Sequence, residues 1–342
     1  MSDAILIVGG YGAVGAVIAE ALAPDHEDQL ILAGRNAERA AAQAAKLGAG
    51  LRWRVLDVAG AVDYDEVLAG VGIVVMCLDL PNLEFVRQCF QRGIHYVDIS
   101  AEYPILSAIA SLDEVARQHG AMAVLSVGLV PGLSNLMARH SLRFVKRIAH
   151  FDSAILAGLG EKHGVAGSTW ILNHMGDAAG MNRLQFREPY HEKPVHRFAF
   201  SDQYTLPLTL PIADAATWLG FDSFLMTQLV GLARRPLLRG LFRREAVKRA
   251  LLSLTQRFQF GSEEFVLTTR ASGETGIYQA WLRGTREAEV TGLVTAEIVD
   301  RITMEHSAPG VYHIEQLFAL EDVLPRLEKH GVTFADGMTR AG

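Results

Sequence analysis

Short apolar runs alternate with amphipathic stretches through the first 128 residues of the chain. The runs have the length of buried strands, and the stretches between them place apolar residues at helical spacing. This pattern predicts six strands joined by five helices, with strands at 4–8, 29–33, 51–56, 73–78, 95–99 and 121–127 and helices at 13–22, 37–47, 62–68, 83–91 and 106–118. Strict alternation specifies a doubly wound parallel sheet, and strands this apolar are expected to be covered on both faces.

After Gly128 the pattern becomes less regular. We expect a helix from Leu133, an irregular segment with strands over 151–222 and a helical region over 224–257. Three antiparallel strands are predicted at 265–270, 278–285 and 288–293, the last leading into a helix toward Met304. A short strand and a final helix are expected within 311–330.

These elements predict an α/β protein with two domains, which suits a length of 342 residues. Residues 1–128 are expected to form an N-terminal domain with a doubly wound parallel sheet. Residues 129–307 are expected to form a second, mixed α/β domain. The tail, 308–342, is expected to pack back on the first domain.

Composition narrows the class of protein. Half of the residues are hydrophobic and a fifth are charged, as in an ordinary globular protein. The formal net charge of -6 argues against a dedicated nucleic-acid binder. The two cysteines, Cys77 and Cys89, lie in apolar surroundings and imply no disulfide framework. Without a recognisable signal peptide or an apolar run long enough for a membrane span, we expect a soluble, cytoplasmic protein.

A glycine-rich loop follows the first predicted strand. Residues 10–15 read Gly-Tyr-Gly-Ala-Val-Gly, which is G-x-G-x-x-G between a strand and a helix. Such glycines allow a tight turn, a close approach of backbone to a pyrophosphate, and close packing of the helix on the strand. The alternative is a tight turn without a ligand. We predict dinucleotide contacts from Gly10, Tyr11, Gly12, Val14 and Gly15.

The end of the second predicted strand indicates which dinucleotide is bound. NAD-selective sites place an acidic residue there to hold the ribose 2′-hydroxyl. This chain has Gly34, Arg35 and Asn36 instead. A guanidinium can pair with a 2′-phosphate, so NADP(H) is the predicted cofactor. The alternative is that Arg35 is an ordinary surface arginine.

Further contacts are expected where the other parallel strands end, because ligands bind outside the carboxyl ends of such strands. Asp57 and Val58 follow the third strand, and Cys77 and Leu78 end the fourth. Cys77 is expected to be a small buried residue rather than a nucleophile, since nothing basic adjoins it in sequence. The same geometry nominates the residues after strands five and six: Asp98, Ser100, Glu102 and 128–135.

Several segments together resemble the saccharopine dehydrogenase family. They are Gly9-Gly10-Tyr11-Gly12, Ala33-Gly34-Arg35-Asn36, the run Gly93-Ile94-His95-Tyr96-Val97-Asp98-Ile99-Ser100, Pro131-Gly132-Leu133-Ser134-Asn135 and the C-terminal Pro309-Gly310-Val311-Tyr312. The resemblance implies an inserted second domain with substrate contacts, often a dimer interface, and a C-terminus that returns to the first domain. Better-known members reduce an imine formed between a carbonyl compound and an amine.

The chain departs from that family in two ways. It is shorter than typical saccharopine-forming enzymes, and residues 77–81, Cys-Leu-Asp-Leu-Pro, replace the small glycine-containing turn common after strand four. Both departures count against saccharopine itself as the product.

Candidates for catalysis come from both predicted domains. Imine reduction needs hydride delivery, orientation and a proton donor, while the cofactor supplies the difficult chemistry. Asp98, at a strand's carboxyl end, is the first candidate, with a cap or turn carboxylate as the alternative. His163, His174 and His191 lie in glycine-rich or irregular segments, and His174 is the second candidate. No metal is expected, because neither H-E-x-x-H nor paired C-x-x-C occurs.

The helix after Gly132 could direct its N-terminus at an anionic substrate group, whereas Ser134 and Asn135 could equally cap that helix. A basic stretch also runs from Arg234 to Arg257, with apolar residues at helical spacing. It is consistent with a helix on an anionic membrane, but packing on the sheet or on a second subunit is favoured.

The sequence therefore predicts an NADP(H)-dependent oxidoreductase that reduces a C=N bond between a small carbonyl compound and an amine. It also predicts a homodimer. Two alternatives stay open: a carbonyl or enoyl reductase on the same scaffold, and a non-catalytic NADPH-binding protein. Fold alone does not choose between them, because function depends on the site.

Overall fold

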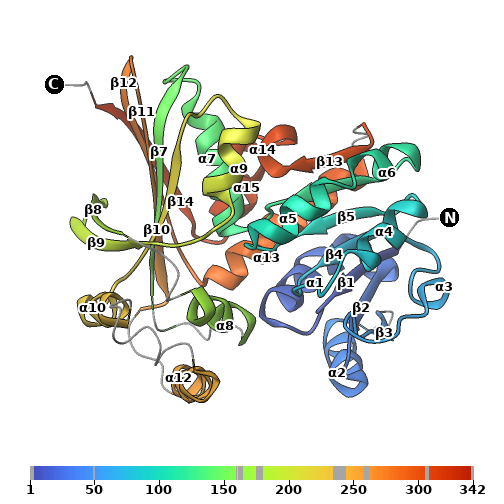
Figure 1. The fold of residues 1–342 in the computed structure, drawn as a ribbon. Helices are drawn as coiled ribbons and strands as arrows, with labels where there is room; N and C mark the ends of the chain where they lie inside the picture. Colours follow the sequence, from blue (N-terminus) through green and yellow to red (C-terminus); the bar gives the residue numbers. More distant parts are fainter. Residues whose placement is uncertain are drawn as a thin grey trace. The chain divides into compact units, whose positions relative to one another are not determined.

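The computed structural model describes residues 4–48, 51–158, 160, 165–174, 180–233, 244–257, 262–304 and 308–339. The chain divides into two compact units. The first unit contains Met1–Leu133 and Ala288–Phe318, and the second contains Ser134–Glu287 and Ala319–Gly342. Each unit is built around one seven-stranded sheet (Figure 1).

The first sheet is wholly parallel and has the order β13-β6-β5-β4-β1-β2-β3. Its strands are β1 (Ala4–Val8), β2 (Leu30–Gly34), β3 (Arg52–Val55), β4 (Val71–Met76), β5 (His95–Asp98), β6 (Met122–Leu125) and β13 (Gly310–His313). The chain winds outward in one direction from β1 to β3 and in the other from β4 to β6. The strand order therefore reverses between β1 and β4, the switch point where open α/β sheets bind ligands.

Helices connect these parallel strands. They are α1 (Ala13–His26), α2 (Ala37–Leu47), α3 (Tyr64–Val67), α4 (Glu84–Gln91), α5 (Tyr103–Ala110), α6 (Asp113–Gln118), α13 (Glu287–Met304) and α14 (Ile314–Leu317), with a short 3₁₀ turn at Glu27–Gln29. Every residue of β1 and β2 is buried, because these central strands are covered on both faces. Packing on α1 is close: a Cβ added to Gly292 of α13 would lie 2.6 Å from a methyl carbon of Val17.

The predicted Rossmann sheet is confirmed, with three corrections. Strand β3 is not covered on both faces: Trp53 is 43% and Val55 is 54% exposed, because β3 is the last strand at its edge of the sheet. The helix expected at 106–118 is two helices, since the chain leaves helical geometry between Ala110 and Asp113. A seventh strand, β13, joins the sheet beside β6 from far along the chain.

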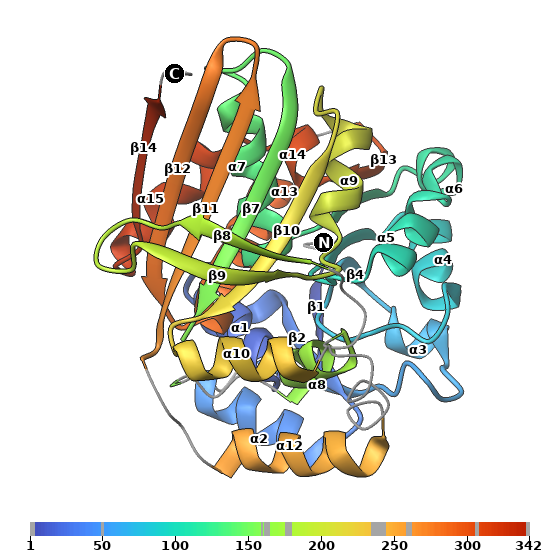
Figure 2. The ribbon, with the colours of Figure 1, turned by 60° about the vertical axis from the view of Figure 1, so that its left-hand side comes forward.

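The second sheet is mixed and has the order β14-β12-β11-β7-β10-β9-β8. Its strands are β7 (Ile148–Ala157), β8 (Met181–Gln185), β9 (Glu192–Arg197), β10 (Ala215–Phe221), β11 (Glu264–Gly273), β12 (Gly276–Thr285) and β14 (Thr333–Thr339). Only β7 and β10 pair in parallel; the other neighbours are antiparallel. Figure 2 shows this sheet with the long strands β7, β11 and β12 side by side.

Six helices accompany this sheet among the residues described. They are α7 (Ser134–Ser141), α8 (Val165–His174), α9 (Asp202–Thr209), α10 (Phe224–Ala233), α12 (Glu245–Arg257) and α15 (Leu320–Lys329). Helix α7 contacts both α9 and α15. It also packs on β11 and β12, while α9 packs on β10 and α15 on β14. A predicted second α/β unit with a mixed sheet is thus confirmed.

Two further expectations fail in the second half of the chain. Residues 288–293, predicted as a strand, form the first part of α13. The β-branched pair Val290 and Thr291 suits a strand, but Val290, Gly292 and Leu293 are buried in the first unit as part of a helix. The tail does not return as a whole to the first unit: β13 and α14 belong to it, whereas β14 pairs antiparallel with β12 of the second.

Candidate functional site

The glycine loop lies at the carboxyl end of β1, where the strand order reverses. The Gly9 and Gly10 amides donate to the Ala33 carbonyl of β2, at 2.8 and 3.2 Å, and the Gly12 amide donates to the Gly9 carbonyl at 2.8 Å. Gly9 has φ +85°, a conformation that favours glycine. These bonds hold the turn tightly against the end of β2.

Gly15 meets the tightest backbone contact of the loop. A Cβ added there would lie 2.3 Å from the Gly9 carbonyl oxygen and 2.9 Å from the Gly10 Cα. Both contacts are with backbone, so no side-chain movement can relieve them. At Gly12 the same added atom would lie 3.1 Å from the Gly9 oxygen. The third glycine therefore allows α1 to start directly on the loop, as the motif predicts.

The N-terminus of α1 differs from those of the next two helices. Its N-cap residue, Gly12, has no side chain to accept from the first-turn amides. In contrast, Asn36 accepts from the Arg39 amide to cap α2, and Asp63 accepts from two amides to cap α3. A helix N-terminus left without a side-chain cap suits an anion such as a pyrophosphate. The residues of this loop thus fit a dinucleotide.

Tyr11 extends from the loop to the end of β2. Its hydroxyl accepts from the Asn36 amide at 3.0 Å, and its ring lies where a Cβ on Gly34 would be, 2.4 Å from the nearest ring carbon. The Arg39 guanidinium carbon lies 4.8 Å from the ring centroid, a cation–π contact. The structure thereby brings together Tyr11, Gly34 and Asn36 and adds Arg39, which the sequence analysis missed.

Arg35 projects from this same corner. Its side chain is exposed, and within the described parts of the chain it makes no hydrogen bond or ion pair. Arg39 lies one helical turn further along, also exposed. Arg39 is in the first turn of α2, whose N-cap is Asn36, so its closeness to the end of β2 follows from where the helix begins. Two exposed guanidinium groups therefore stand close in sequence at the end of β2.

The other predicted cofactor residues occupy the strand ends on either side. Asp57 and Val58 follow β3, and the Asp57 carboxylate accepts from the Ala59 amide at 3.1 Å. Cys77 and Leu78 follow β4 and lie against the loop: Leu78 side-chain carbons would be 3.1 Å from a Cβ on Gly9. Burial raises the pKa of the Cys77 thiol, and nearby Asp98 adds to the effect, so this thiol is not an activated nucleophile.

Asp98 ends β5 and is 1% exposed. The Tyr96 hydroxyl donates to one carboxylate oxygen at 2.8 Å, and the Ser100 amide donates to the other at 2.7 Å. Burial raises the pKa of Asp98 to about 6 despite these two donors, with a smaller contribution from Asp79. The geometry matches the turn-carboxylate alternative, because both oxygens are used to organise the loop after β5.

Asp98→Asn should change the pH dependence of stability. The folded-state pKa lies above the ordinary value, so the native state holds an extra proton between about pH 4 and 6. The contribution of the raised Asp98 pKa to the free energy of unfolding is complete below that pH range. It is lost as the pH rises through 6. We expect the unfolding free energy of the wild type to fall relative to D98N by on the order of 2–3 kcal/mol from pH 4 to pH 7.

Urea titrations of both proteins across that range measure the difference. Asp28→Asn, which removes an exposed carboxylate from the same unit, is the control for loss of one negative charge. A constant difference between wild type and D98N over the whole range would contradict the expectation.

One buried polar pair at the same edge was not predicted. Ser126 follows β6 and His313 ends β13, and Ser126 Oγ lies 2.8 Å from His313 Nδ1. Ser126 is fully buried and has φ +58°, rare for a residue with a side chain. Burial lowers the pKa of His313 to about 4. Local sequence carries no signal for this pair, because the residues are 187 positions apart.

The predicted second-unit residues do not gather into one site. His174 ends α8, where its ring stacks on Trp170 with centroids 4.5 Å apart and its Nδ1 bonds the Trp170 carbonyl. His191 is exposed in the turn between β8 and β9. Ser134 begins α7, is fully buried and bonds the buried carboxylate of Asp202. His163 lies outside the described residues.

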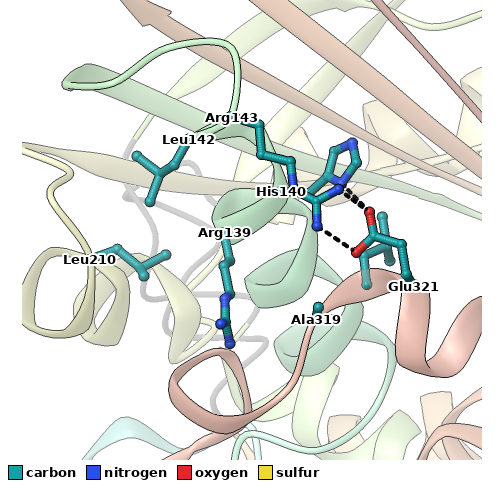
Figure 3. Close-up of a pocket in the computed structure, with 8 residues that line it drawn as sticks. Arg139, His140, Leu142, Arg143, Leu210, Ala319 and Glu321 are labelled. Atoms are coloured by element: carbon teal, nitrogen blue, oxygen red, sulfur yellow. Dashed lines mark hydrogen bonds and ion pairs between the residues drawn. The ribbon is translucent and has the colours of Figure 1, made fainter.

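The second unit also contains a pocket of about 390 Å³. It is lined by Arg139, His140, Leu142, Arg143, Leu210, Ala319, Leu320 and Glu321. Figure 3 shows Arg143 and His140 turned toward Glu321, with Arg139 at the other side. His140 Nδ1 lies 2.9 Å from Glu321, and its Nε2 lies 3.3 Å from Asp336. These contacts fasten α15 and β14 to α7.

Of the basic stretch, residues 234–243 lie outside the described residues. Lys248 on α12 donates to Asn173 of α8 at 2.8 Å and pairs with Glu245 at 3.2 Å. Arg244 and Arg249 are exposed. Helix α12 thus packs on α8 in the second unit, and its role as an interface stays a prediction.

The fold and the loop define a dinucleotide-binding protein of the Rossmann class. Residues 5–124 match the family described as saccharopine dehydrogenase NADP binding domain, so the resemblance predicted from the motifs is confirmed for this part of the chain. NAD(P) is accordingly the class of cofactor that this unit binds. The match covers β1 through most of β6 and so contains the whole loop and the end of β2.

Two relatives extend the comparison. Meso-diaminopimelate D-dehydrogenase of Bacteroides fragilis is 28% identical over 132 residues, which are 37% of this chain and 40% of that protein. The alignment thus spans less than half of the relative's length. Apo saccharopine dehydrogenase (L-Glu forming) of Saccharomyces cerevisiae aligns over 99% of this chain and 100% of its own, with 14% identity and a TM-score of 0.68. This likeness establishes a shared fold across both units.

None of the helices in the described ranges has the length and apolarity needed to cross a bilayer.

Proposed function

We propose that the protein is an NADP(H)-dependent oxidoreductase that reduces the C=N bond of an imine formed from a small carbonyl compound and an amine. The observation that carries the proposal is the first unit's NADP-binding family domain, together with the exposed Arg35 at the end of β2. In this proposal the first unit binds the cofactor, and the second contributes substrate contacts and a dimer interface. A cytoplasmic homodimer is part of the same proposal.

The choice of NADP(H) over NAD(H) rests on the corner around Tyr11. Arg35 is exposed and accessible to a 2′-phosphate, and Arg39 supplies a second positive charge over the Tyr11 ring. The bond from the Asn36 amide to the Tyr11 hydroxyl fixes this ring against Gly34. A guanidinium pairs with phosphate through charge-assisted hydrogen bonds, whereas a ribose hydroxyl offers it no negative charge. The corner therefore favours the phosphorylated dinucleotide.

The reaction makes modest demands on the protein. Bound NADPH would supply the hydride, and the protein's residues position and desolvate the acceptor. Cys77 and Leu78 follow β4, and Asp98 ends β5. In the order β5-β4-β1-β2 these two strands lie on the other side of β1 from β2, whose end carries Arg35. We assign Cys77 and Leu78 to cofactor contacts. Asp98, with both oxygens engaged, supports the substrate-side loop, and His174 stays a candidate for the second unit.

The C=N specificity is drawn from the relatives. The Bacteroides fragilis protein and the Saccharomyces cerevisiae protein are both named as dehydrogenases of amino-acid compounds, meso-diaminopimelate and saccharopine. Oxidation of such compounds breaks a C–H bond beside nitrogen, and the reverse reaction reduces a C=N bond. We extend this chemistry, though not those substrates, to the present chain.

The test follows NADPH absorbance while the full-length protein meets 2-keto acids and aldehydes, each with and without a panel of amino acids. We expect NADPH oxidation only when both a carbonyl compound and an amine are present. Oxidation with the carbonyl compound alone would replace the proposal by a carbonyl reductase. Tight NADPH binding with no oxidation in any mixture would indicate a non-catalytic NADPH-binding protein.

A further inference from the structure

The hydrogen bond between Ser126 and His313 determines whether Nδ1 of the imidazole ring donates or accepts. Ser126 Oγ lies 2.8 Å from His313 Nδ1, and Ser126 is fully buried. Among the described residues the serine hydroxyl has no other hydrogen-bond partner. A buried hydroxyl left without an acceptor loses its bond to water and gains nothing in return. The hydroxyl proton is therefore expected to point at Nδ1, which makes Nδ1 the acceptor.

This assignment determines the other ring nitrogen. In a neutral imidazole one nitrogen accepts and the other carries the proton. If Nδ1 accepts from Ser126, Nε2 carries the hydrogen. Burial keeps the ring neutral, because it lowers the pKa of His313 to about 4. Within the described parts of the chain, Nε2 makes no hydrogen bond and His313 is half-buried, so its N–H is left without an acceptor inside the protein.

The pair lies where a substrate, rather than the dinucleotide, is expected to bind. Both residues lie at carboxyl ends of parallel strands, on the edge of the sheet that carries the glycine loop. β13 is four strands from β1 in the order β13-β6-β5-β4-β1. At about 4.8 Å between neighbouring strands, His313 lies roughly 19 Å along the sheet from the end of β1. This distance places the ring beyond the pyrophosphate site, on the side opposite the Arg35 corner.

The backbone around Ser126 supports a specific role. Ser126 has φ +58°, a left-handed conformation that costs on the order of 1 kcal/mol for a residue with a Cβ. The next residue, Val127, donates its amide to the Asp98 carbonyl at 3.1 Å, so the loops after β5 and β6 are joined. Strained residues that persist are typical of functional sites. Here the strain is located at the serine that orients the histidine.

We propose that His313, oriented by Ser126, donates its Nε2–H to a carbonyl or carboxylate oxygen of the substrate. This inference rests on the proposed function, because it assumes that a substrate lies at this edge of the sheet. The group acts as a neutral donor that positions an oxygen acceptor; it transfers no proton. Ser126 is a positioning residue that acts through His313.

The tautomer can be tested without a substrate. In the full-length protein labelled with ¹⁵N-histidine, the His313 signals at pH 7 should show the Nε2–H form, with His313→Gln used for assignment. In Ser126→Ala the ring should lose this preference and show a mixture of the two tautomers. An Nδ1–H form or a charged ring in the wild type would overturn the proposal, whatever reaction the protein catalyses.

The substrate contact is tested with matched amides. The amide nitrogen of Gln replaces an Nε2–H donor in reach, whereas that of Asn stops short. His313→Asn should raise the KM for the carbonyl substrate on the order of tenfold above the wild-type value. His313→Gln should keep the KM close to that of the wild type. NADPH binding should be unchanged in both. His119→Gln, an exposed histidine of the same unit, is the control.

Comparison of a 2-keto acid with the corresponding aldehyde identifies the oxygen. If the KM of H313N rises for the keto acid alone, His313 contacts the carboxylate. If the KM rises equally for the keto acid and the aldehyde, His313 contacts the carbonyl oxygen. Unchanged kinetics in a folded H313N would refute the contact. If the wild type oxidises no NADPH, pyruvate is titrated into the protein with NADP⁺ while the Nε2–H signal is followed. A shift then supports the contact although the proposed reaction has failed, and no shift overturns it.

Discussion

Gly15→Ala is expected to abolish tight NADPH binding and to destabilise the first unit. The added Cβ would meet the Gly9 carbonyl oxygen at 2.3 Å and the Gly10 Cα at 2.9 Å. Since both are backbone atoms, α1 must move away from the loop or the loop must open. Overpacking of this kind costs about 1–3 kcal/mol of unfolding free energy. Because the same movement displaces the α1 amides from a phosphate, NADPH affinity should fall on the order of a hundredfold, about 3 kcal/mol.

Urea unfolding measures the first effect, and NADPH fluorescence titration the second. Gly60→Ala is the matched control, because a Cβ there has no neighbour nearer than 3.6 Å. It should leave both quantities close to those of the wild type. If G15A bound NADPH as the wild type does, the loop would not be the phosphate site.

Arg35→Ala should remove most of the preference of the protein for NADPH over NADH. The side chain is exposed at the end of β2 and has no partner in the described residues, so its removal disturbs no internal contact. A hydrogen bond to a charged group is worth about 1.5–3 kcal/mol. NADPH affinity should therefore fall roughly 10- to 150-fold, while NADH affinity changes by less than about threefold.

Dissociation constants for both dinucleotides in wild type and variant provide the comparison. Arg52→Ala removes an exposed arginine at the amino end of neighbouring β3 and should affect neither dinucleotide. Equal losses for NADPH and NADH in R35A would show that Arg35 does not recognise the 2′-phosphate. In that case Arg39 over the Tyr11 ring becomes the residue to test.

Much of the first unit was predictable because its signals are local. Fully buried strands such as β1 and β2 read as continuous apolar runs, and the loop between β1 and α1 has fixed glycine spacing. The predicted contacts of Tyr11, Gly34 and Asn36 lie together for the same reason: adjacent parallel strands end at one edge. Periodicity and spacing report on such neighbours directly.

What could not be predicted depends on contacts between distant residues. β14 reads Thr-Phe-Ala-Asp-Gly-Met-Thr, without a regular alternation, and it is a strand because all of it pairs with Ile277–Arg283 of β12. The start of α13 contains the β-branched pair Val290 and Thr291, which suits a strand as long as the packing of the segment is unknown. The Ser126–His313 pair is invisible locally: His313 directly follows the Pro309–Tyr312 segment, but nothing in that segment points to a residue 187 positions away. Tertiary pairing decides all three cases.

The interrupted order of the first unit has a consequence for biosynthesis. The chain leaves this unit after Leu133 and returns to it at Ala288, and β13 is added only after α13. Until then β6, whose four residues are all buried in the finished protein, is an unpaired apolar strand edge. Such edges recruit other chains, so nascent or C-terminally shortened products should depend on chaperones or aggregate. Synthesis from the N-terminus also delays the Ser126–His313 pair. A ribosome-bound intermediate that already has the glycine loop would still lack β13 and its His313.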